Sequence, residues 1–125
     1  LNPMITCIVI DDDANTTKVF SDILELIGLH VVGKGYDGHD AVSLYEKHRP
    51  DVVFIDVVMP HADGFYALEK IREIDPNAKV IAVTADFTVD VERRLKEMSI
   101  TAIIRKPFDQ NEIKQVLTQK YKIST

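Results

Sequence analysis

Carboxylates follow two of the apolar runs in this chain, at the points where the runs stop. Asp11, Asp12 and Asp13 come directly after the run at 8–10, and Asp56 follows the run at 52–55. Adjacent like charges at the end of a buried strand repel and raise each other's pKa, a cost that a bound cation relieves. Mg²⁺ prefers oxygen ligands and needs only one or two direct carboxylates. The first two aspartates and Asp56 are therefore candidate magnesium ligands, whereas Asp13 suits the cap of a following helix.

A hydroxyl and an ammonium group follow two further apolar runs. Thr84 ends the run at 80–83, and Lys106 comes one residue after the run at 102–104. The hydroxyl is suited to bind a phosphoryl oxygen, and Pro107 restricts the backbone of Lys106 toward an extended form. The plainer alternatives are a strand-end threonine, a surface lysine, and an Asp56 that only caps a loop or pairs with Lys106.

The elements that would position these side chains alternate regularly. Apolar runs at 5–10, 30–34, 51–55, 79–83 and 101–104 are separated by stretches with helical spacing of apolar residues, the first of which ends at Gly28. A capping box at 109–112 opens the last helix. The side chains expected to face inward from the five helices are Phe20, Ile23, Leu24 and Ile27; Val42 and Tyr45; Phe65, Leu68, Ile71 and Ile74; Phe87, Val91, Leu95 and Met98; and Ile113, Val116 and Leu117.

Strands that alternate with helices of this length predict right-handed βαβ units and a parallel sheet covered on both faces. The continuously apolar runs at 52–55 and 80–83 are typical of buried central strands. We therefore expect a three-layer α/β/α sandwich of five strands and five helices. Ligand sites in open parallel sheets lie beyond the carboxyl ends of the strands. The polar side chains described above should then meet in one cleft.

Composition narrows the classes of function. With 125 residues, 46% of them hydrophobic, we expect one domain over 4–125, with residues 1–3 ahead of Met4 compatible with a cloning remnant. A net charge of −5 and the lack of a basic run argue against a nucleic-acid partner. The lone Cys7 is interpreted as a buried thiol of a reducing compartment, which favours a cytoplasmic protein. No apolar run approaches the ~20 residues that cross a bilayer, so no membrane partner is expected.

The motifs together resemble the receiver domain of two-component response regulators, the CheY-like family. The resemblance covers nearly the whole chain, and the spacing of its blocks fits. It implies a flavodoxin-like sheet of strand order 2-1-3-4-5. The blocks that carry it are Asp11-Asp12, Asp56 with Met59-Pro60 and Asp63-Gly64, Thr84-Ala85, and Lys106-Pro107-Phe108.

The resemblance implies that Asp56 accepts a phosphoryl group from a phosphohistidine on a sensor histidine kinase or a histidine phosphotransfer protein. It also implies a Mg²⁺ cofactor, ligated by Asp12, Asp56 and the backbone carbonyl of Val58, with Asp11 acting through water. Positioning and electrostatics carry most of phosphoryl transfer, so a small carboxylate cleft is sufficient for this chemistry.

By the same resemblance, Thr84 and Lys106 would hold phosphoryl oxygens, and the Lys106–Pro107 bond would be cis. A downstream protein would bind the face formed by the fourth helix, fifth strand and fifth helix, although its mixed charges also suit an ordinary solvated face. Ile103 departs from the family, which usually places Tyr or Phe there as part of the switch. The charged residues of this face are Asp90, Arg93, Arg94, Glu97, Lys114 and Lys120.

The function expected from these observations is a single-domain response regulator, a phosphoacceptor rather than a classical enzyme. A receiver excised from a longer regulator and a pseudo-receiver that serves only as an interaction module are the alternatives. A haloacid-dehalogenase-like phosphohydrolase is disfavoured because Val58 occupies the place of its second aspartate.

Overall fold

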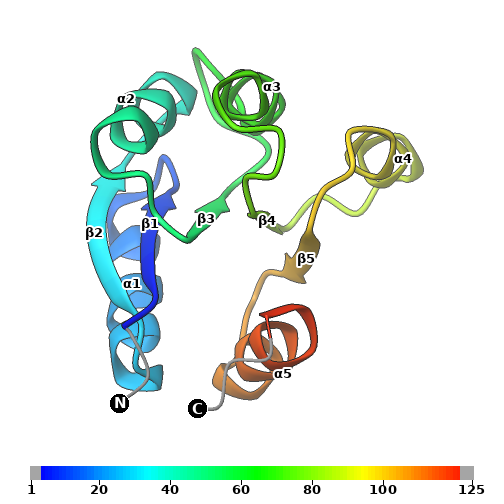
Figure 1. Cartoon of the computed structure of the whole chain (residues 1–125). Coiled ribbons are helices and arrows are strands. Elements are labelled where there is room, and N and C mark those ends of the chain that lie inside the picture. Colours follow the sequence, from blue (N-terminus) through cyan, green and yellow to red (C-terminus); the bar gives the residue numbers. More distant parts are fainter. Residues whose placement is uncertain (1–3, 122–125) are drawn as a thin grey trace.

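The computed structural model describes residues 4–121, in which five strands alternate with five helices (Figure 1). Residues 1–3 and 122–125 lie outside the described residues, as does the side chain of Lys120. The elements are β1 (Thr6–Ile10), α1 (Ala14–Ile27), β2 (His30–Gly35), α2 (Gly38–His48), β3 (Val52–Ile55), α3 (Gly64–Ile74), β4 (Val80–Thr84), α4 (Val89–Glu97), β5 (Ala102–Arg105) and α5 (Gln110–Tyr121).

The five strands form one parallel sheet of order β2-β1-β3-β4-β5, which confirms the predicted fold. Every residue of β3 and β4 is buried, as their continuous apolar runs predicted. In the register, Ile10 pairs with Ile55 and Thr84 pairs with Arg105. The chain therefore leaves β1 beside the point where it leaves β3. It likewise leaves β4 beside the point where it leaves β5.

Helices cover both faces of the sheet, with α1 and α5 on one side and α2, α3 and α4 on the other (Figure 1). The alternation of side chains along a strand produces this arrangement. Cys7 and Val9 of β1 pack with the core under α1 and α5, whereas Ile8 and Ile10 pack with the core under α2 and α3. A smaller cluster around Leu95 holds α4 against the sheet.

The predicted helix ends are largely confirmed. Asp13 caps α1 by accepting the Asn15 N–H, and α1 ends at Gly28, whose φ of 113° is left-handed. At the start of α5, the Asp109 carboxylate accepts the Glu112 N–H at 2.8 Å, as the capping box predicted. The Glu112 carboxylate instead accepts the N–H of Arg105 at 3.2 Å, so the last helix is tied to the end of β5.

Two predicted inward positions are wrong. Val42 is only partly buried and belongs to no core cluster, because α2 turns Ala41 and Tyr45 to the sheet. Phe87 lies before α4, and its side chain is 40% exposed.

The start of α4 is set by two polar caps. Asp86 accepts the N–H of Thr88 at 3.0 Å, and Thr88 accepts the N–H of Val91 at 3.3 Å. These bonds satisfy backbone groups that would otherwise extend the helix backward. The helix therefore begins at Val89 and leaves Phe87 in the preceding loop.

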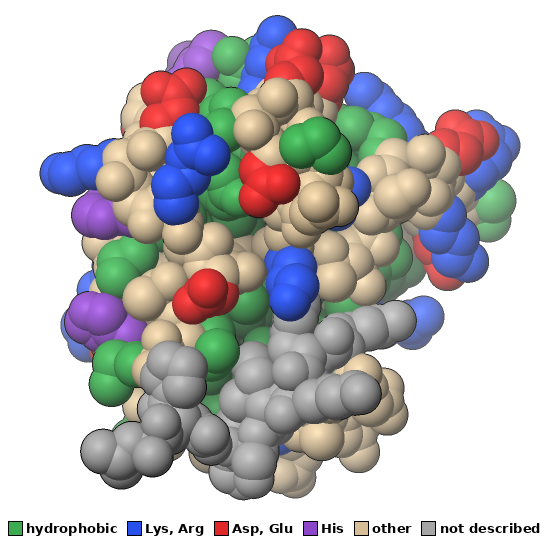
Figure 2. Space-filling model, viewed as in Figure 1, with side chains coloured by type: hydrophobic (Ala, Val, Ile, Leu, Met, Phe, Trp, Pro, Cys, Tyr) green, Lys and Arg blue, Asp and Glu red, His purple; other side chains and the backbone are tan. Residues whose placement is uncertain are grey.

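Within residues 4–121, no helix has both the length and the apolar character that crossing a membrane requires. On the face that Figure 2 shows, acidic and basic side chains are interspersed and do not gather into one basic area.

Candidate functional site

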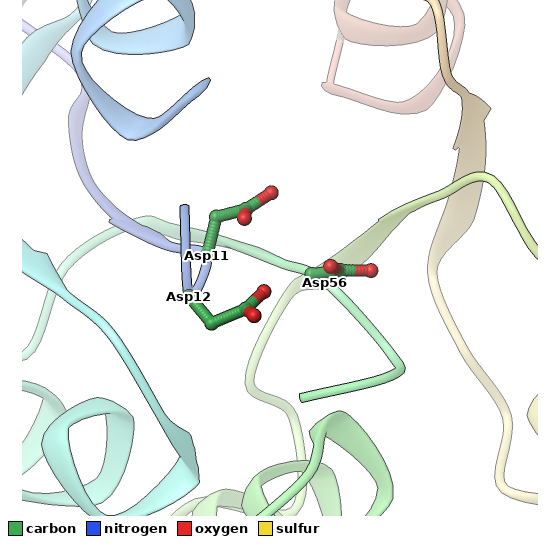
Figure 3. Close-up of side chains that lie close together, drawn as sticks. All are labelled: Asp11, Asp12 and Asp56. Carbon is green, nitrogen blue, oxygen red and sulfur yellow. The ribbon is translucent and has the colours of Figure 1, made fainter. Parts of the chain in front are cut away.

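The ends of β1 and β3 bring three carboxylates together. The Asp56 N–H donates to the Ile10 carbonyl at 2.9 Å, which fixes the end of β3 beside the end of β1. Asp11 and Asp12 leave β1 toward Asp56 (Figure 3). Carboxylate oxygens of these three residues lie within 4.8 Å of one another.

The Lys106 ammonium bridges two of these carboxylates. Its Nζ lies 2.5 Å from Asp11 Oδ2 and 3.2 Å from Asp56 Oδ2. Asp11 and Asp56 are only 5% and 8% exposed, and buried charges require such partners. The simple pairing of Asp56 with Lys106, weighed from the sequence as an alternative, is therefore present within a larger cluster.

Backbone donors hold the remaining oxygens of the two buried carboxylates. Asp11 Oδ1 accepts the N–H of Asp13 at 2.9 Å, and Asp56 Oδ1 accepts the N–H of Val57 at 2.8 Å. Asp12 is exposed, and no hydrogen bond of its carboxylate to another part of the described chain is seen. The cluster thus combines two oriented carboxylates with one that is open to solvent.

The environment changes the proton affinity of two of these groups. Burial raises the pKa of Asp56, and the nearby Asp11 charge raises it further, although Lys106 acts in the opposite direction. Burial by itself would lower the pKa of Lys106, but the hydrogen bond to Asp11 and the charges of Asp56 and Asp11 raise it overall. Lys106 therefore stays charged at neutral pH, and Asp56 carries a costly negative charge.

The donor set of the cluster fits a hard divalent cation. Three carboxylates on adjacent strand ends supply oxygen ligands, and Mg²⁺ prefers such ligands while it retains several waters. A divalent charge would also relieve the repulsion among these groups. The ligand role that the family resemblance implies for the backbone carbonyl of Val58 stays a prediction.

Beyond the carboxylates lies a hollow of about 750 Å³, lined in part by Asp56, Val58, Thr84 and Lys106. Thr84 is buried, and its Oγ1 accepts the N–H of Asp86 at 3.1 Å. A hydroxyl that accepts can still donate its own proton, so Thr84 retains a donor that can serve a ligand in the hollow. The Lys106–Pro107 bond is cis, as predicted.

Two residues that support the site were not assigned a role from the sequence. A Cβ at Gly64 would lie 2.4 Å from the Asp56 carbonyl oxygen, so only glycine allows α3 to begin this close to the acidic cluster. The buried Thr17 hydroxyl lies 3.0 Å from the carbonyl oxygens of both Asp11 and Asp13 and braces the acidic turn. Gly64 belongs to the Asp63-Gly64 block of the family resemblance, but no physical reason for a glycine at that position was visible in the sequence. No local sequence pattern marks Thr17.

Comparison with known proteins agrees with this geometry. The response regulator receiver domain family matches residues 7–118. The chain is 30% identical to the chemotaxis protein CheY of Thermotoga maritima over 112 residues, which cover 90% of this chain and 93% of that protein. It is 33% identical to the probable C4-dicarboxylate response regulator DctR of Priestia megaterium over 115 residues, which cover 91% of this chain and 50% of that protein.

A solved structure supports the same grouping. A chain in the crystal structure of the CheX–CheY–BeF₃–Mg²⁺ complex from Borrelia burgdorferi superposes with a TM-score of 0.87 at 28% identity, covering 92% of this chain and 87% of that chain. The fold and the acidic cluster define a phosphoacceptor module rather than a classical enzyme. This chain belongs to the response regulator receiver domain family.

Proposed function

We propose that the chain is a single-domain response regulator, covering 4–125, that accepts a phosphoryl group on Asp56. The observation that carries the proposal is the cluster of Asp11, Asp12 and Asp56 around the Lys106 ammonium at the carboxyl ends of the strands. Asp11 and Asp56 are both buried and both contact the ammonium, but of the three carboxylates Asp56 is the one that lines the hollow that can receive a donor.

In the proposed reaction, a carboxylate oxygen of Asp56 attacks the phosphorus of a phosphohistidine. The new bond is an acyl phosphate O–P bond, and the P–N bond breaks with its electron pair passing to the imidazole nitrogen, which takes up a proton. The Lys106 ammonium, already 3.2 Å from Asp56, would balance the charge of the transferred group. The Thr84 hydroxyl would donate a hydrogen bond to a phosphoryl oxygen.

Asp12, Asp56 and the carbonyl of Val58 would hold Mg²⁺ directly, with Asp11 acting through water. Bound there, the ion would neutralise charge between the acceptor and the phosphoryl oxygens. The close packing of the three carboxylates supports this assignment, as does the Mg²⁺ of the Borrelia burgdorferi complex.

The donor would be a sensor histidine kinase or a histidine phosphotransfer protein in the cytoplasm. Output would follow when phosphorylation changes the face of α4, β5 and α5 toward a downstream protein. On that face Arg93 pairs with Asp90 at 3.0 Å, and the Arg94 guanidinium stacks on Phe65 at 3.9 Å from the ring centroid. Two of the positive charges on this face therefore already have partners within the chain. No nucleic-acid or membrane partner is part of the proposal.

Intact-mass spectrometry after incubation with acetyl phosphate tests the proposal. We expect a Mg²⁺-dependent gain of one phosphoryl group in the native protein and none in the Asp56→Asn variant. An equal gain in that variant would refute the acceptor assignment, and no gain in the native protein would favour the pseudo-receiver alternative. The alternative of a receiver excised from a longer regulator is supported by DctR, of which this chain covers only 50%. It is tested separately by the length of the open reading frame that encodes this chain, since a longer reading frame with an output domain would favour it.

A further inference from the structure

The short segment 35–38, which joins β2 to α2, contacts both loops that carry the acidic cluster. The Gly35 carbonyl accepts the N–H of Asp11 at 3.1 Å, in the turn that follows β1. Three residues later, the Gly38 N–H donates to the Ala62 carbonyl at 2.7 Å, in the loop between β3 and α3. The segment therefore connects the two places at which the carboxylates leave the sheet.

This segment is held in one shape by Asp40, in the first turn of α2. Its Oδ2 accepts the N–H of Tyr36 at 2.8 Å, and its own N–H donates to Oδ1 of Asp37, the cap of α2, at 2.9 Å. The ring of His39 stacks edge-on against the ring of Tyr66 at 5.0 Å, so the start of α2 also packs on the start of α3 (Figure 1). The two ends of the segment therefore keep a defined separation.

Gly38 allows the close contact between α2 and the loop that follows β3. It is buried, and a Cβ placed on it would lie 2.7 Å from the carbonyl oxygen of Asp63 and 3.0 Å from that of Ala62. Both atoms belong to the backbone, which cannot rotate away as the end of a side chain can. The φ of Gly38 is not left-handed, so alanine fits its backbone angles and would act through this contact.

The loop between β3 and α3 would transmit such a displacement to the acceptor site. Its ends are joined by a hydrogen bond from the Gly64 N–H to the Val57 carbonyl at 2.9 Å. Gly64 also packs directly on the Asp56 carbonyl, where no space for a Cβ exists. Val58, the next residue of the loop, lines the acceptor hollow. A push at one side of this closed loop therefore moves the backbone beside the acceptor.

We propose that the 35–38 segment is a spacer, which sets the gap between the acidic turn after β1 and the loop after β3, with Gly38 and Asp40 as positioning residues for Mg²⁺. The inference rests on the proposed function, because the ion would take oxygen ligands from both sides of this gap. Neither positioning residue is among the proposed ligands. Each acts through the backbone contacts that the segment makes at its two ends.

The choice of ion makes the width of this gap important. Mg²⁺ requires near-octahedral geometry with bonds of about 2.1 Å, so it tolerates little displacement of its ligands. Residues that orient metal ligands without touching the metal typically change its affinity by about 10–100-fold when they are substituted. A spacer that keeps the two loops in register would therefore be measurable as metal affinity.

Mg²⁺ titration of the full chain by isothermal calorimetry tests the spacer. We expect Gly38→Ala to weaken Mg²⁺ binding by about tenfold or more. The matched control is Gly33→Ala in β2, where the added Cβ would lie 2.9 Å from the end of the Leu44 side chain. This variant disturbs the same strand and helix without meeting the backbone of the β3–α3 loop, so its Kd should stay near the native value.

Two substitutions of Asp40 separate positioning from charge, and they test the spacer even if Gly38→Ala does not fold. Both Asp40→Ala and Asp40→Asn remove one negative charge. The asparagine side-chain oxygen can still accept the Tyr36 N–H, whereas alanine removes the acceptor. We expect Asp40→Ala to weaken Mg²⁺ binding and Asp40→Asn to keep most of the native affinity. An equal loss in both variants would assign the effect to charge and overturn the spacer.

The Mg²⁺ affinity of the native protein separates this inference from the proposed function. If the native protein binds Mg²⁺ and Gly38→Ala binds it equally well, the spacer is overturned and the proposed function stands. An equal loss in Gly33→Ala and Gly38→Ala also overturns the spacer, because affinity would then follow general packing. If the native protein binds no Mg²⁺, the metal-dependent reaction and the spacer are both overturned.

Discussion

The substitution Asp56→Asn is expected to stabilise the fold when Mg²⁺ is absent. Burial and the Asp11 charge raise the pKa of Asp56 in the folded protein, so the folded state favours the neutral carboxyl relative to the unfolded state. A carboxyl with a raised pKa contributes stability below its ordinary value of 3.8, and this contribution is lost as the pH rises. At neutral pH the native protein therefore carries a cost that a neutral amide removes.

The magnitude follows from the distances in the cluster. The carboxylate oxygens of Asp11, Asp12 and Asp56 lie within 4.8 Å of one another, and at an effective dielectric constant of ~20 unit charges at that limit repel by about 3.5 kcal/mol. The attraction of Asp56 to Lys106 at 3.2 Å is about 5 kcal/mol on the same scale. The further repulsion from the exposed Asp12 brings these terms close to balance. The desolvation of the buried charge remains, and we expect a net gain on the order of 2 kcal/mol for Asp56→Asn.

Urea unfolding of both proteins, with EDTA and with Mg²⁺, measures this difference. A cation that binds only the folded state at ten times its dissociation constant adds about 1.4 kcal/mol to the free energy of unfolding. The native protein should gain this increment and the variant should lose most of it, so the gap between them narrows in Mg²⁺. The gap should also narrow as the pH falls through the raised pKa of Asp56 toward its ordinary value of 3.8, because the folded protein then takes up the proton and loses the buried charge.

The reasoning is refuted if Asp56→Asn lowers the free energy of unfolding in EDTA, or if Mg²⁺ stabilises both proteins equally. The control is Asp22→Asn, which removes an exposed carboxylate paired with Lys18 at 3.1 Å. Exposed pairs contribute ~0–1 kcal/mol, so this variant should differ little from the native protein in either condition.

Three further predictions concern the scaffold. Ser21→Ala should raise the free energy of unfolding by ~1 kcal/mol, because the buried Ser21 Oγ has no hydrogen-bond partner in the described part of the chain; a lower urea midpoint would contradict this. Arg72→Ala should destabilise by about 2–4 kcal/mol and speed amide exchange in the loop before β5, since Arg72 donates to the carbonyls of Ala78, Met98 and Ser99; unchanged exchange there would count against it. Burial raises the pKa of Cys7 to about 12, so iodoacetamide at pH 8 should modify it only as fast as the protein unfolds, and a rate independent of urea would disprove its protection.

Much of the fold could be predicted from local pattern. The alternation of Ile8 and Val9 between two cores, the apolar runs of β3 and β4, and the caps at Asp13 and Gly28 all follow from the spacing of nearby residues. Such features depend on backbone periods of 2 and 3.6 residues, which are visible in a short window. The strand order was expected only through resemblance to a family, since alternation alone does not specify which strands are neighbours.

The contacts of the site depended on the tertiary structure. Lys106 reaches Asp11 across 95 positions of the chain and Asp56 across 50, and only the register of the sheet determines that one ammonium touches both. The outward place of Phe87 came from caps that start α4 later than its apolar spacing suggested. The sequence by itself thus determined which side chains stand at the strand ends, because short-range spacing encodes strands and helices. Distances, burial and charge balance were decided by the packing of segments far apart in the chain, which no local pattern contains.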